Sequence, residues 1–370
     1  HLAFLSGNEV YWKTRWEDNH RTLVCYKEGG LGENQCGFKC DTSTPIWTGT
    51  WRDGSPTNYP GSDGGRPENA LTGQISWGDG TGSITVPETY KNLRFWRNTS
   101  IANLGEGQSV TLPYGTLGYE FDFEQFHAFY PPGRVTLSST FLVGKNHKLA
   151  MYRHSSGALV FGAGTVQWSW GLDEHHDRGN EAPSLDMQQA TLNIFTDMGV
   201  LPATVQSELI ISNPINVNPP VSAIVSPLQN STFPQNGLAT ISGPASDTDG
   251  VVAGVEVSVD GGATWNVAVG MTNWSYSWIP TAQGLVTIQT RAFDDNGNIE
   301  TPGEGITVTI VEPEPIVCPC SIFANTSTPA LHENDGQPIE VGMKFKSAVD
   351  GYITGIRFYK AIGDNGTHTG

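Results

Sequence analysis

The chain opens with HLAFLSGNEVYWK, in which polar side chains follow directly on a short apolar run. The LAFL run is typical of a strand, and SGNE has the composition of a tight turn. Loops and turns positioned by a scaffold commonly carry catalytic or binding side chains. Asn8, Glu9 and Tyr11 are therefore our candidate catalytic residues. Glu9 has an equally good structural interpretation, in which its carboxylate caps the start of a following helix.

Two further stretches place charged side chains at spacings that chemistry could use. In GGRPEN, Arg66 and Glu68 are candidate substrate-binding residues at a pocket mouth. The structural alternative is an ion pair of Arg66 with Glu68 or Asp63, which at a surface contributes about 0–1 kcal/mol. GLDEHHD (171–177) carries two histidines and three acidic residues that could bind a metal or shuttle protons. Adjacent His side chains point in different directions in most backbones, so we favour a surface loop there.

A possible calcium site lies in the second half of the chain. DTDG (247–250) and DDNGN (294–298) each follow a strand-like run. Asp247, Asp249 and Asp295 could supply oxygen ligands to Ca²⁺, as happens between tandem extracellular β-domains. The alternative is a pair of turns in which Asp and Asn side chains bond to the backbone.

Composition restricts the class of protein. Asp and Glu number 37 against 20 Lys and Arg, for a net charge of −17, which argues against a nucleic-acid partner. No apolar run approaches the roughly 20 residues of a membrane-spanning helix. Gly 44 and Pro 23, with many short apolar runs bounded by turn residues, predict a mostly β chain. Low Lys with high Asn, Thr, Ser and Gly suits a secreted or cell-surface bacterial protein.

The five cysteines also bear on whether the protein lies in an oxidising compartment. In an oxidising compartment the simplest pair among the first three is Cys36 with Cys40. A zinc site on Cys25, Cys36 and Cys40 would need a fourth ligand, and none is spaced to suit. A bond between Cys318 and Cys320 would close a strained ring, so we expect their partners beyond residue 370. The odd count leads us to expect a fragment of a longer protein.

Two Pro-rich stretches divide the chain into three segments. ISNPINVNPP (211–220) has the composition of a linker, and the alternating prolines of VEPEPIVCP (311–319) favour an extended backbone. We expect mixed α/β structure over 1–210 and an Ig-like β-sandwich over 221–312. Residues 316–370 should begin a further β-domain that continues beyond the sequence.

Local patterns predict several elements of the first segment. A helix is expected to begin within 10–16, after the opening turn. KLAMYRHSSGALVFGAG predicts two strands around a Ser-Ser-Gly turn. SLDMQQATLNIFTDMG predicts a helix with Ser184 as N-cap, Gly199 at the C′ position and an apolar stripe facing the core. Trp168 and Trp170 are two residues apart and are expected to share a strand face, where they could line a substrate cleft or, as we favour, fill the core.

The middle segment contains about seven short alternating runs at intervals of eight to twelve residues, the pattern of an Ig-like sandwich. Trp265, Trp274 and Trp278 are the expected bulky core residues. SVDGGATW (258–265) matches the Asp-box pattern S-x-D-x-G-x-T-W. There, Asp260 would accept backbone N–H bonds across a hairpin turn. The pattern occurs once, which excludes a propeller built from such repeats.

The first segment resembles a known family along its whole length. HLAFLSGNEVYWKTRWE, GGRPENALTG, LRFWRNTSIA, GTLGYEFD, SGALVFGAGTVQWSWGLD and MQQATLNIFTDMGV occur in one order. Together they resemble the C-terminal domain of the N,N-dimethylformamidase large-subunit family, a relative of the glutamine-amidotransferase-like α/β fold. That resemblance implies a parallel sheet and an upstream half that this sequence lacks. The third segment resembles the start of a bacterial domain of unknown function, a jelly-roll-like β-sandwich that follows Ig-like modules in secreted proteins.

The resemblance also implies chemistry. Formamidases of this family are understood to use a mononuclear iron on tyrosine and glutamate oxygens, which polarises the amide carbonyl and activates water. Tyr11 matches a family aromatic position, and Glu9, Glu68 and Glu120 are the candidate glutamates. We take Tyr11 and Glu120 as the candidate metal ligands, with a second tyrosine expected upstream. An amidotransferase would carry a cysteine at the turn after such a strand. The SGNE turn has none, which argues against a thiol mechanism.

These observations favour a fragment of a secreted or cell-surface bacterial multidomain protein. Its first domain would hydrolyse the C–N bond of a small amide with a metal-activated water near the opening turn. The alternative is a non-catalytic surface protein that binds a polysaccharide or another polymer. In that case Trp47, Trp51, Trp77 and Trp96 would stack on sugar rings.

Overall fold

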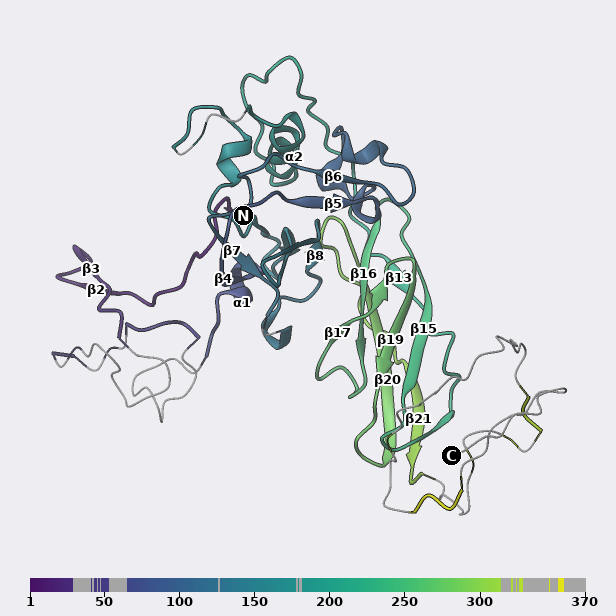
Figure 1. Ribbon diagram of the computed structural model, residues 1–370. Helices are drawn as coiled ribbons and strands as arrows, with labels where there is room; N and C mark the ends of the chain where they lie inside the picture. The colour runs from purple at the N-terminus through teal and green to yellow at the C-terminus, as the bar shows by residue number, and fades with distance from the viewer. Residues whose placement is uncertain are drawn as a thin grey trace, which may run out of the picture. The chain divides into compact units, whose positions relative to one another are not determined.

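The computed structural model describes most of residues 1–313 and a few positions beyond them. The described residues are 1–28, 41, 43–44, 46, 48–52, 65–125, 127–177, 179, 182–313, 321, 324, 326–328, 346 and 352–355, without the side chains of residues 76, 77 and 127. The chain forms two compact units, His1–Glu312 and Pro313–Gly370. Figure 1 shows the first unit, in which strands predominate over helices.

Several predictions fall outside the described residues. These are the strands expected within 316–370, the pairing of Cys36 with Cys40, the partners of Cys318 and Cys320, and the positions of Asp63, Trp47 and the Trp77 side chain. Cys25 is described, and it is exposed with a free thiol. The predicted boundaries at 211–220 and 316 stay predictions.

A four-stranded sheet lies at the centre of the first segment. Its order is β1 (Leu2–Phe4), β12 (Leu159–Gly162), β11 (Ala150–Arg153) and β8 (Val135–Thr136). β1 runs parallel to β12, and the other two pairings are antiparallel. The opening strand and the two strands around the Ser-Ser-Gly turn are therefore confirmed.

The first segment has four further strand pairs outside this sheet, each antiparallel. They are β2 (Arg15–Glu17) with β3 (Thr22–Val24), β4 (Ile75–Asp79) with β7 (Glu120–Phe123), β5 (Thr85–Pro87) with β6 (Ser109–Thr111), and β9 (Thr140–Leu142) with β10 (Lys145–His147). They make the first segment a mostly β structure.

The helix expected to begin within 10–16 is wrong. Asn8 and Val10 both have left-handed backbone angles, with φ of 53° and 57°, which an α-helix does not tolerate. The chain instead continues extended, with Trp12 bridged to Thr50, and enters strand β2. Glu9 therefore caps no helix, and the structural interpretation of its carboxylate is wrong as well.

Helices are short apart from one. They are α1 (Asn69–Thr72), α2 (Leu185–Asp197) and the 3₁₀ turns η1 (Glu88–Tyr90), η2 (Arg94–Trp96), η3 (Ile101–Asn103), η4 (His127–Phe129) and η5 (Trp168–Gly171). α2 is the predicted helix: the Ser184 hydroxyl accepts the Met187 N–H at 3.3 Å, and Gly199 follows with φ of 77°. The predicted strand face for Trp168 and Trp170 is wrong, because both lie in η5.

The core of the first segment is built on aromatic contacts between distant elements. Phe95 and Trp96 of η2 are buried, and the Phe95 ring stacks on Phe161 of β12 with centroids 5.2 Å apart. Trp168 is also buried and meets Phe161 edge-on, whereas Trp170 is only partly buried. The apolar stripe of α2 completes this core through Met187, Ala190 and Ile194.

The middle segment is the predicted Ig-like sandwich. One sheet has the order β13 (Val221–Ser222), β15 (Ala239–Ser246), β19 (Asn273–Trp278) and β18 (Val269–Gly270). The other has the order β14 (Thr232–Pro234), β21 (Ile306–Val311), β20 (Gly284–Asp294), β16 (Val252–Ser258) and β17 (Asn266–Val267). Trp274 is the core tryptophan, and Trp265 and Trp278 are half-buried.

The single Asp box forms the β16–β17 hairpin turn as predicted. Asp260 Oδ1 accepts the Thr264 N–H at 2.9 Å and the Ser258 hydroxyl at 2.7 Å. Trp265 donates its indole N–H to Gly262 O at 3.1 Å. The motif is thus a folding device of one hairpin.

One buried histidine makes the stability of the first segment depend on pH. His147 is fully buried, and its Nε2 lies 3.0 Å from Ala163 O, a carbonyl that can only accept. Burial lowers its pKa from 6.5 to about 4, helped by the charges of Lys148 and Arg134. The unfolded chain therefore takes up this proton at a higher pH than the folded chain.

We predict that this histidine contributes stability in full above pH 6.5 and that the contribution is lost as pH falls towards 4. The loss should reach about 3 kcal/mol of unfolding free energy. Urea unfolding at several pH values should show a smaller acid dependence in His147→Gln, which keeps a donor for Ala163. Parallel curves for the two proteins would contradict the assignment.

Candidate functional site

The turn after β1 is bound to strand β7 by one residue, Asn8. Its backbone N–H donates to Asp122 Oδ1 at 2.9 Å, and its side-chain Nδ2 donates to Glu120 Oε2 at 2.8 Å. Glu120 and Asp122 are two apart on β7 and share a face, while Phe121 between them lies in the core. Asn8 thereby joins the opening turn to two carboxylates of one strand.

Close backbone packing fixes the other side of the turn. A Cβ on Gly7 would lie 2.9 Å from the backbone nitrogen of Thr165, so only glycine allows this approach. Thr165 N–H donates to Ser6 O at 3.2 Å, and Asp122 N–H donates to Gly164 O at 2.8 Å. The segment that follows β12 therefore lies between the opening turn and β7.

Glu68, at the start of α1, enters the same site through an arginine. Its side chain is buried, and Arg52 donates to both of its carboxylate oxygens at 2.8–3.0 Å. The Arg52 guanidinium also lies over the Tyr11 ring, 4.7 Å from the centroid. The predicted ion pair of Arg66 with Glu68 is wrong, because Glu68 pairs with Arg52 and the Arg66 guanidinium lies over Trp51.

Asp122 therefore lies within electrostatic reach of three other carboxyl groups, Glu9, Glu68 and Glu120, and of the Arg52 guanidinium. We call Glu9, Glu68, Glu120 and Asp122, with Asn8, Tyr11 and Arg52, the carboxylate site. In Figure 1, helix α1, which follows Glu68, and strand β7 lie close to the N-terminus. Every predicted residue of the opening turn belongs to it, as do Glu68 and Glu120, whereas Arg66 lies on the neighbouring Trp51.

Burial sets the electrostatics of this site. Burial raises the pKa of Asp122 to about 7, and the charges of Glu68 and Glu120 act in the same direction. The Asn8 N–H and Arg52 oppose that rise. The pKa of Glu9 also rises to about 7, through its own partial burial and then through the charge of Asp122. Both groups are thus placed to exchange protons near neutral pH.

Asp122 and Arg52 are the members of the site that sequence reasoning missed. The EFDF run carries a signal for Asp122, because period-two alternation puts it on the same strand face as Glu120. No comparable local signal exists for Arg52, which follows a stretch without periodicity. Its role depends on a contact with Glu68, sixteen residues away.

The GLDEHHD stretch forms the surface loop that we favoured. The His175 side chain is 81% exposed and its Nδ1 lies 3.1 Å from Asp173 Oδ1. His176 turns the other way and stacks on Trp170, with ring centroids 4.5 Å apart. The two histidines therefore do not converge on a common ligand.

The candidate calcium residues lie in turns that bond to the backbone. Asp247 Oδ1 accepts the N–H groups of Asp249 and Gly250, each at 3.0 Å. Asp249 Oδ2 accepts the Asn218 side-chain N–H at 2.8 Å. The second oxygens, Asp247 Oδ2 and Asp249 Oδ1, are buried without a hydrogen-bond partner. Asp295 faces elsewhere, since its Oδ2 accepts the Arg94 N–H at 2.6 Å.

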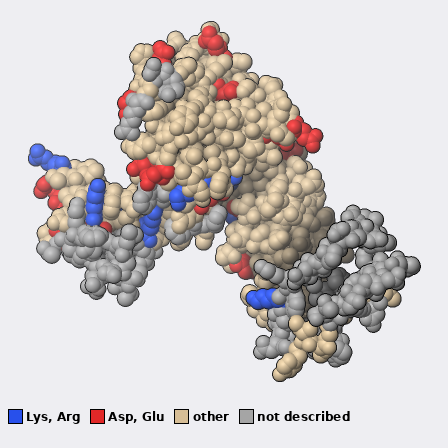
Figure 2. All heavy atoms as spheres, viewed as in Figure 1, with Lys and Arg blue, Asp and Glu red and all other residues tan. Residues whose placement is uncertain are grey.

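Surface charge follows the composition. On the face in Figure 2, acidic side chains are spread over the molecule, whereas basic side chains lie mainly in the left and lower part of the view. The exclusion of nucleic acid stays a prediction. Within the part of the chain that the structure describes, no helix has the length and apolarity needed to cross a membrane.

Family models match the chain in three places. Residues 1–180 match the family described as N,N-dimethylformamidase beta subunit-like, C-terminal. Residues 220–290 match the Bacterial Ig domain family, and residues 326–370 match Domain of unknown function (DUF4082). The predicted resemblances and their order along the chain are confirmed.

Solved structures resemble only part of the chain. Fibronectin(III)-like modules of Clostridium thermocellum CbhA are 25% identical over 25% of this chain and 98% of theirs, with a TM-score of 0.21. The sulfane dehydrogenase SoxCD of Paracoccus pantotrophus is 27% identical over 22% of this chain and 23% of its own, with a TM-score of 0.19. Domains 4 and 5 of the S-layer protein SbsC are 18% identical over 27% of this chain and 54% of theirs, at 0.20. No curated protein matches the chain significantly.

We predict that Arg52→Met lowers the unfolding free energy by about 3 kcal/mol, because it leaves the buried Glu68 carboxylate without its partner. Adding Glu68→Gln to Arg52→Met should recover much of that loss. Urea unfolding of Arg52→Met and of the double variant measures the loss and its recovery. Arg21→Met, at an exposed position, is the control and should change the unfolding free energy by about 0.5 kcal/mol or less. Equal losses at the two arginines would contradict the central place of Arg52.

Calcium binding at Asp247 and Asp249 stays a prediction with its own test. A bound ion would fill the two oxygens that lack partners and raise the melting temperature, with about 2.7 kcal/mol of stabilisation at one hundred times Kd. Asp247→Asn should abolish that shift, whereas Asp260→Asn, in the Asp box, should keep it. Calorimetric titration with CaCl₂ that releases no heat would leave the two turns as purely structural.

Proposed function

We propose that the first segment is a hydrolase domain that cleaves the C–N bond of amides at the carboxylate site. The observation that carries this proposal is the convergence of Asn8, Glu120 and Asp122, which two hydrogen bonds bring together across 112 and 114 positions of the chain. The match of residues 1–180 to a dimethylformamidase-like family supports amide hydrolysis as the reaction class.

The proposed roles follow from where each side chain lies. Glu9 is half-buried on the turn and can accept a proton from the attacking water, then return it to the departing nitrogen. One C–O bond forms, one C–N bond breaks, and the products are a carboxylic acid and an amine. Asn8 holds the turn against β7 and Arg52 holds Glu68, so both act as positioning residues. Asp122, beside Glu9, keeps the local charge low when it carries a proton.

Iron on Tyr11 and Glu120 is part of the proposal as a cofactor. Both side chains offer hard oxygen donors, and such an ion would polarise the amide carbonyl. One Glu120 oxygen already accepts the Asn8 side chain. Among the described residues, no three His, Cys, Asp or Glu side chains form a group that could hold a metal. The described residues do not complete an iron site, and the steps above use the carboxyl groups of this chain.

An α/β amidotransferase-like fold for this segment is likewise a proposal. The parallel pairing of β1 with β12 and the packing of α2 on the core support it. The match to a bacterial Ig family supports an extracellular or cell-surface setting. Polysaccharide binding is the second candidate function, but Trp96 is fully buried, so its predicted stacking role is wrong. Trp51 is the remaining described tryptophan of that set, and Lys13 and Arg66 lie over its ring.

We predict that Glu9→Gln lowers the rate of amide hydrolysis by about 10²–10⁴-fold, the usual contribution of a general base. Its fold should be unchanged, because glutamine has the same shape. Release of amine from a panel of N-alkylformamides and N-alkylacetamides measures the rate.

Glu106→Gln, in an exposed loop, is the matched control and should keep the wild-type rate. A wild-type protein that releases no amine from any member of the panel would refute the proposed function. An undiminished rate in Glu9→Gln would refute only the assignment of Glu9. Retention on immobilised polysaccharide without hydrolysis would favour the second candidate.

A further inference from the structure

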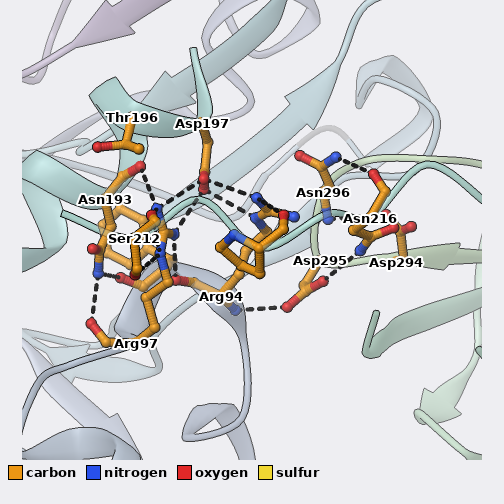
Figure 3. A network of polar contacts seen from close by, with 12 residues as sticks. Arg94, Arg97, Asn193, Thr196, Asp197, Ser212, Asn216, Asp294, Asp295 and Asn296 are labelled. Atoms are coloured by element: carbon orange, nitrogen blue, oxygen red, sulfur yellow. Dashed lines mark hydrogen bonds and ion pairs between the residues drawn. The ribbon is translucent and has the colours of Figure 1, made fainter. Parts of the chain in front are cut away.

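The Ig-like domain meets the first segment along a line of buried polar groups, which we call the seam and which Figure 3 shows. At its centre Asp295, directly after β20, accepts the backbone N–H of Arg94 at 2.6 Å. Asp295 is 2% exposed. Its other oxygen accepts the Asn216 side-chain N–H at 3.2 Å. Within the Ig-like domain the same oxygen also accepts the Val251 N–H, at the longer distance of 3.4 Å. The shortest hydrogen bond to this carboxylate therefore comes from the first segment.

The first segment presents two arginines to the seam. Arg94 and Arg97 both donate to the carboxylate of Asp197, at the end of α2, whose side chain is 2% exposed. Arg97 also donates to Ser212 O at 2.8 Å, and Arg94 donates to Pro214 O at 3.2 Å. The stretch predicted as a linker therefore follows the seam with its carbonyls bonded to these arginines.

The apolar core also crosses the seam. Phe293 of β20 and Ala253 of β16 belong to the same buried cluster as Phe95, Trp96 and Phe161 of the first segment. Phe293 is 1% exposed. Apolar surface of the Ig-like domain is therefore removed from water partly by the first segment.

A second polar contact closes the seam at β11. Arg153 donates to the carbonyl of Asn296 through Nε at 3.0 Å and Nη2 at 2.8 Å. Gly297, with φ of 78°, comes so close that a Cβ there would lie 2.9 Å from the Arg153 backbone nitrogen. Gly133 N–H donates to Glu256 Oε1 at 3.1 Å nearby.

From these contacts we infer that the Ig-like domain is an integral part of the first domain, and that Asp295 couples the two into one cooperative folding unit. Parting them would break the hydrogen bond from the Arg94 N–H to Asp295 and expose the part of Phe293 that lies in the core of the first segment. A buried polar group that loses its hydrogen-bond partner lowers the stability of the fold. Exposing apolar surface to water lowers it as well. An Ig-like module that merely spaced other domains would instead keep a small, polar and separable interface. This inference does not depend on the proposed hydrolase activity.

Hydrogen exchange of the full chain in rising urea, read by mass spectrometry, tests the coupling. Peptides from 94–99 and 185–197 report on the first domain, and peptides from β16 and β20 report on the Ig-like domain. In the wild type both sets should lose protection at the same urea concentration. Asp295→Ala should separate the two midpoints and speed exchange of 94–99 without urea by about tenfold or more.

Two further variants complete the experiment. Asp295→Asn keeps the shape and should show the same separation to a smaller degree if Asp295→Ala does not fold. Asp260→Asn is the control within the Ig-like domain and should speed exchange without urea only in its own hairpin. Different wild-type midpoints, or an effect of both Asp295 variants confined to Ig-like peptides, would overturn the inference.

Discussion

The buried carboxylate of Asp197 is the group on which much of this structure depends. A charge so far from water is tolerated only when oppositely charged donors surround it, and Arg94 and Arg97 provide them. Meeting that requirement fixes η2 against the end of α2. Once η2 is fixed, Phe95 and Trp96 stand in the core under the central sheet, and the Arg94 backbone N–H is turned towards Asp295. The pairing of Asp197 with the two arginines thus helps to position η2, the aromatic core and the contact with the Ig-like domain.

The carboxylate site rests on the same scaffold by a different route. Phe95 stacks on Phe161 of β12, and β12 pairs with β1, which leads into the turn that carries Asn8. The turn is held against β7 because Asn8 bonds to two carboxylates at once. This attachment matters for chemistry, since acid–base groups are effective only when held within hydrogen-bond reach of the reacting atoms.

Sequence patterns predicted what local interactions decide. Helix α2 was predicted from Ser184, its apolar stripe and Gly199, because caps and periodicity act within a few residues. The Asp-box hairpin and the alternating strands of the Ig-like domain have the same local character. The opening turn and the family resemblance led to most of the carboxylate site. The predictions that were wrong depend on tertiary contacts. The hydrogen bond of Asn8 to Asp122 spans 114 positions, and no pattern within residues 10–16 shows that this contact excludes a helix there. The prediction that Trp96 binds a sugar was wrong because the sequence alone does not distinguish a core tryptophan from a surface one.

The close approach at Gly297 has a consequence for how this protein can be rearranged. Ig-like domains are commonly treated as independent modules that can be exchanged between proteins by joining them at linkers. Here a loop of the sandwich lies directly against the backbone of Arg153, and any residue with a Cβ would collide with it. A module taken from elsewhere would bring its own loop and its own side chain to that position. Shuffling this domain therefore means redesigning both partners, because the two are fitted to each other at the level of the backbone.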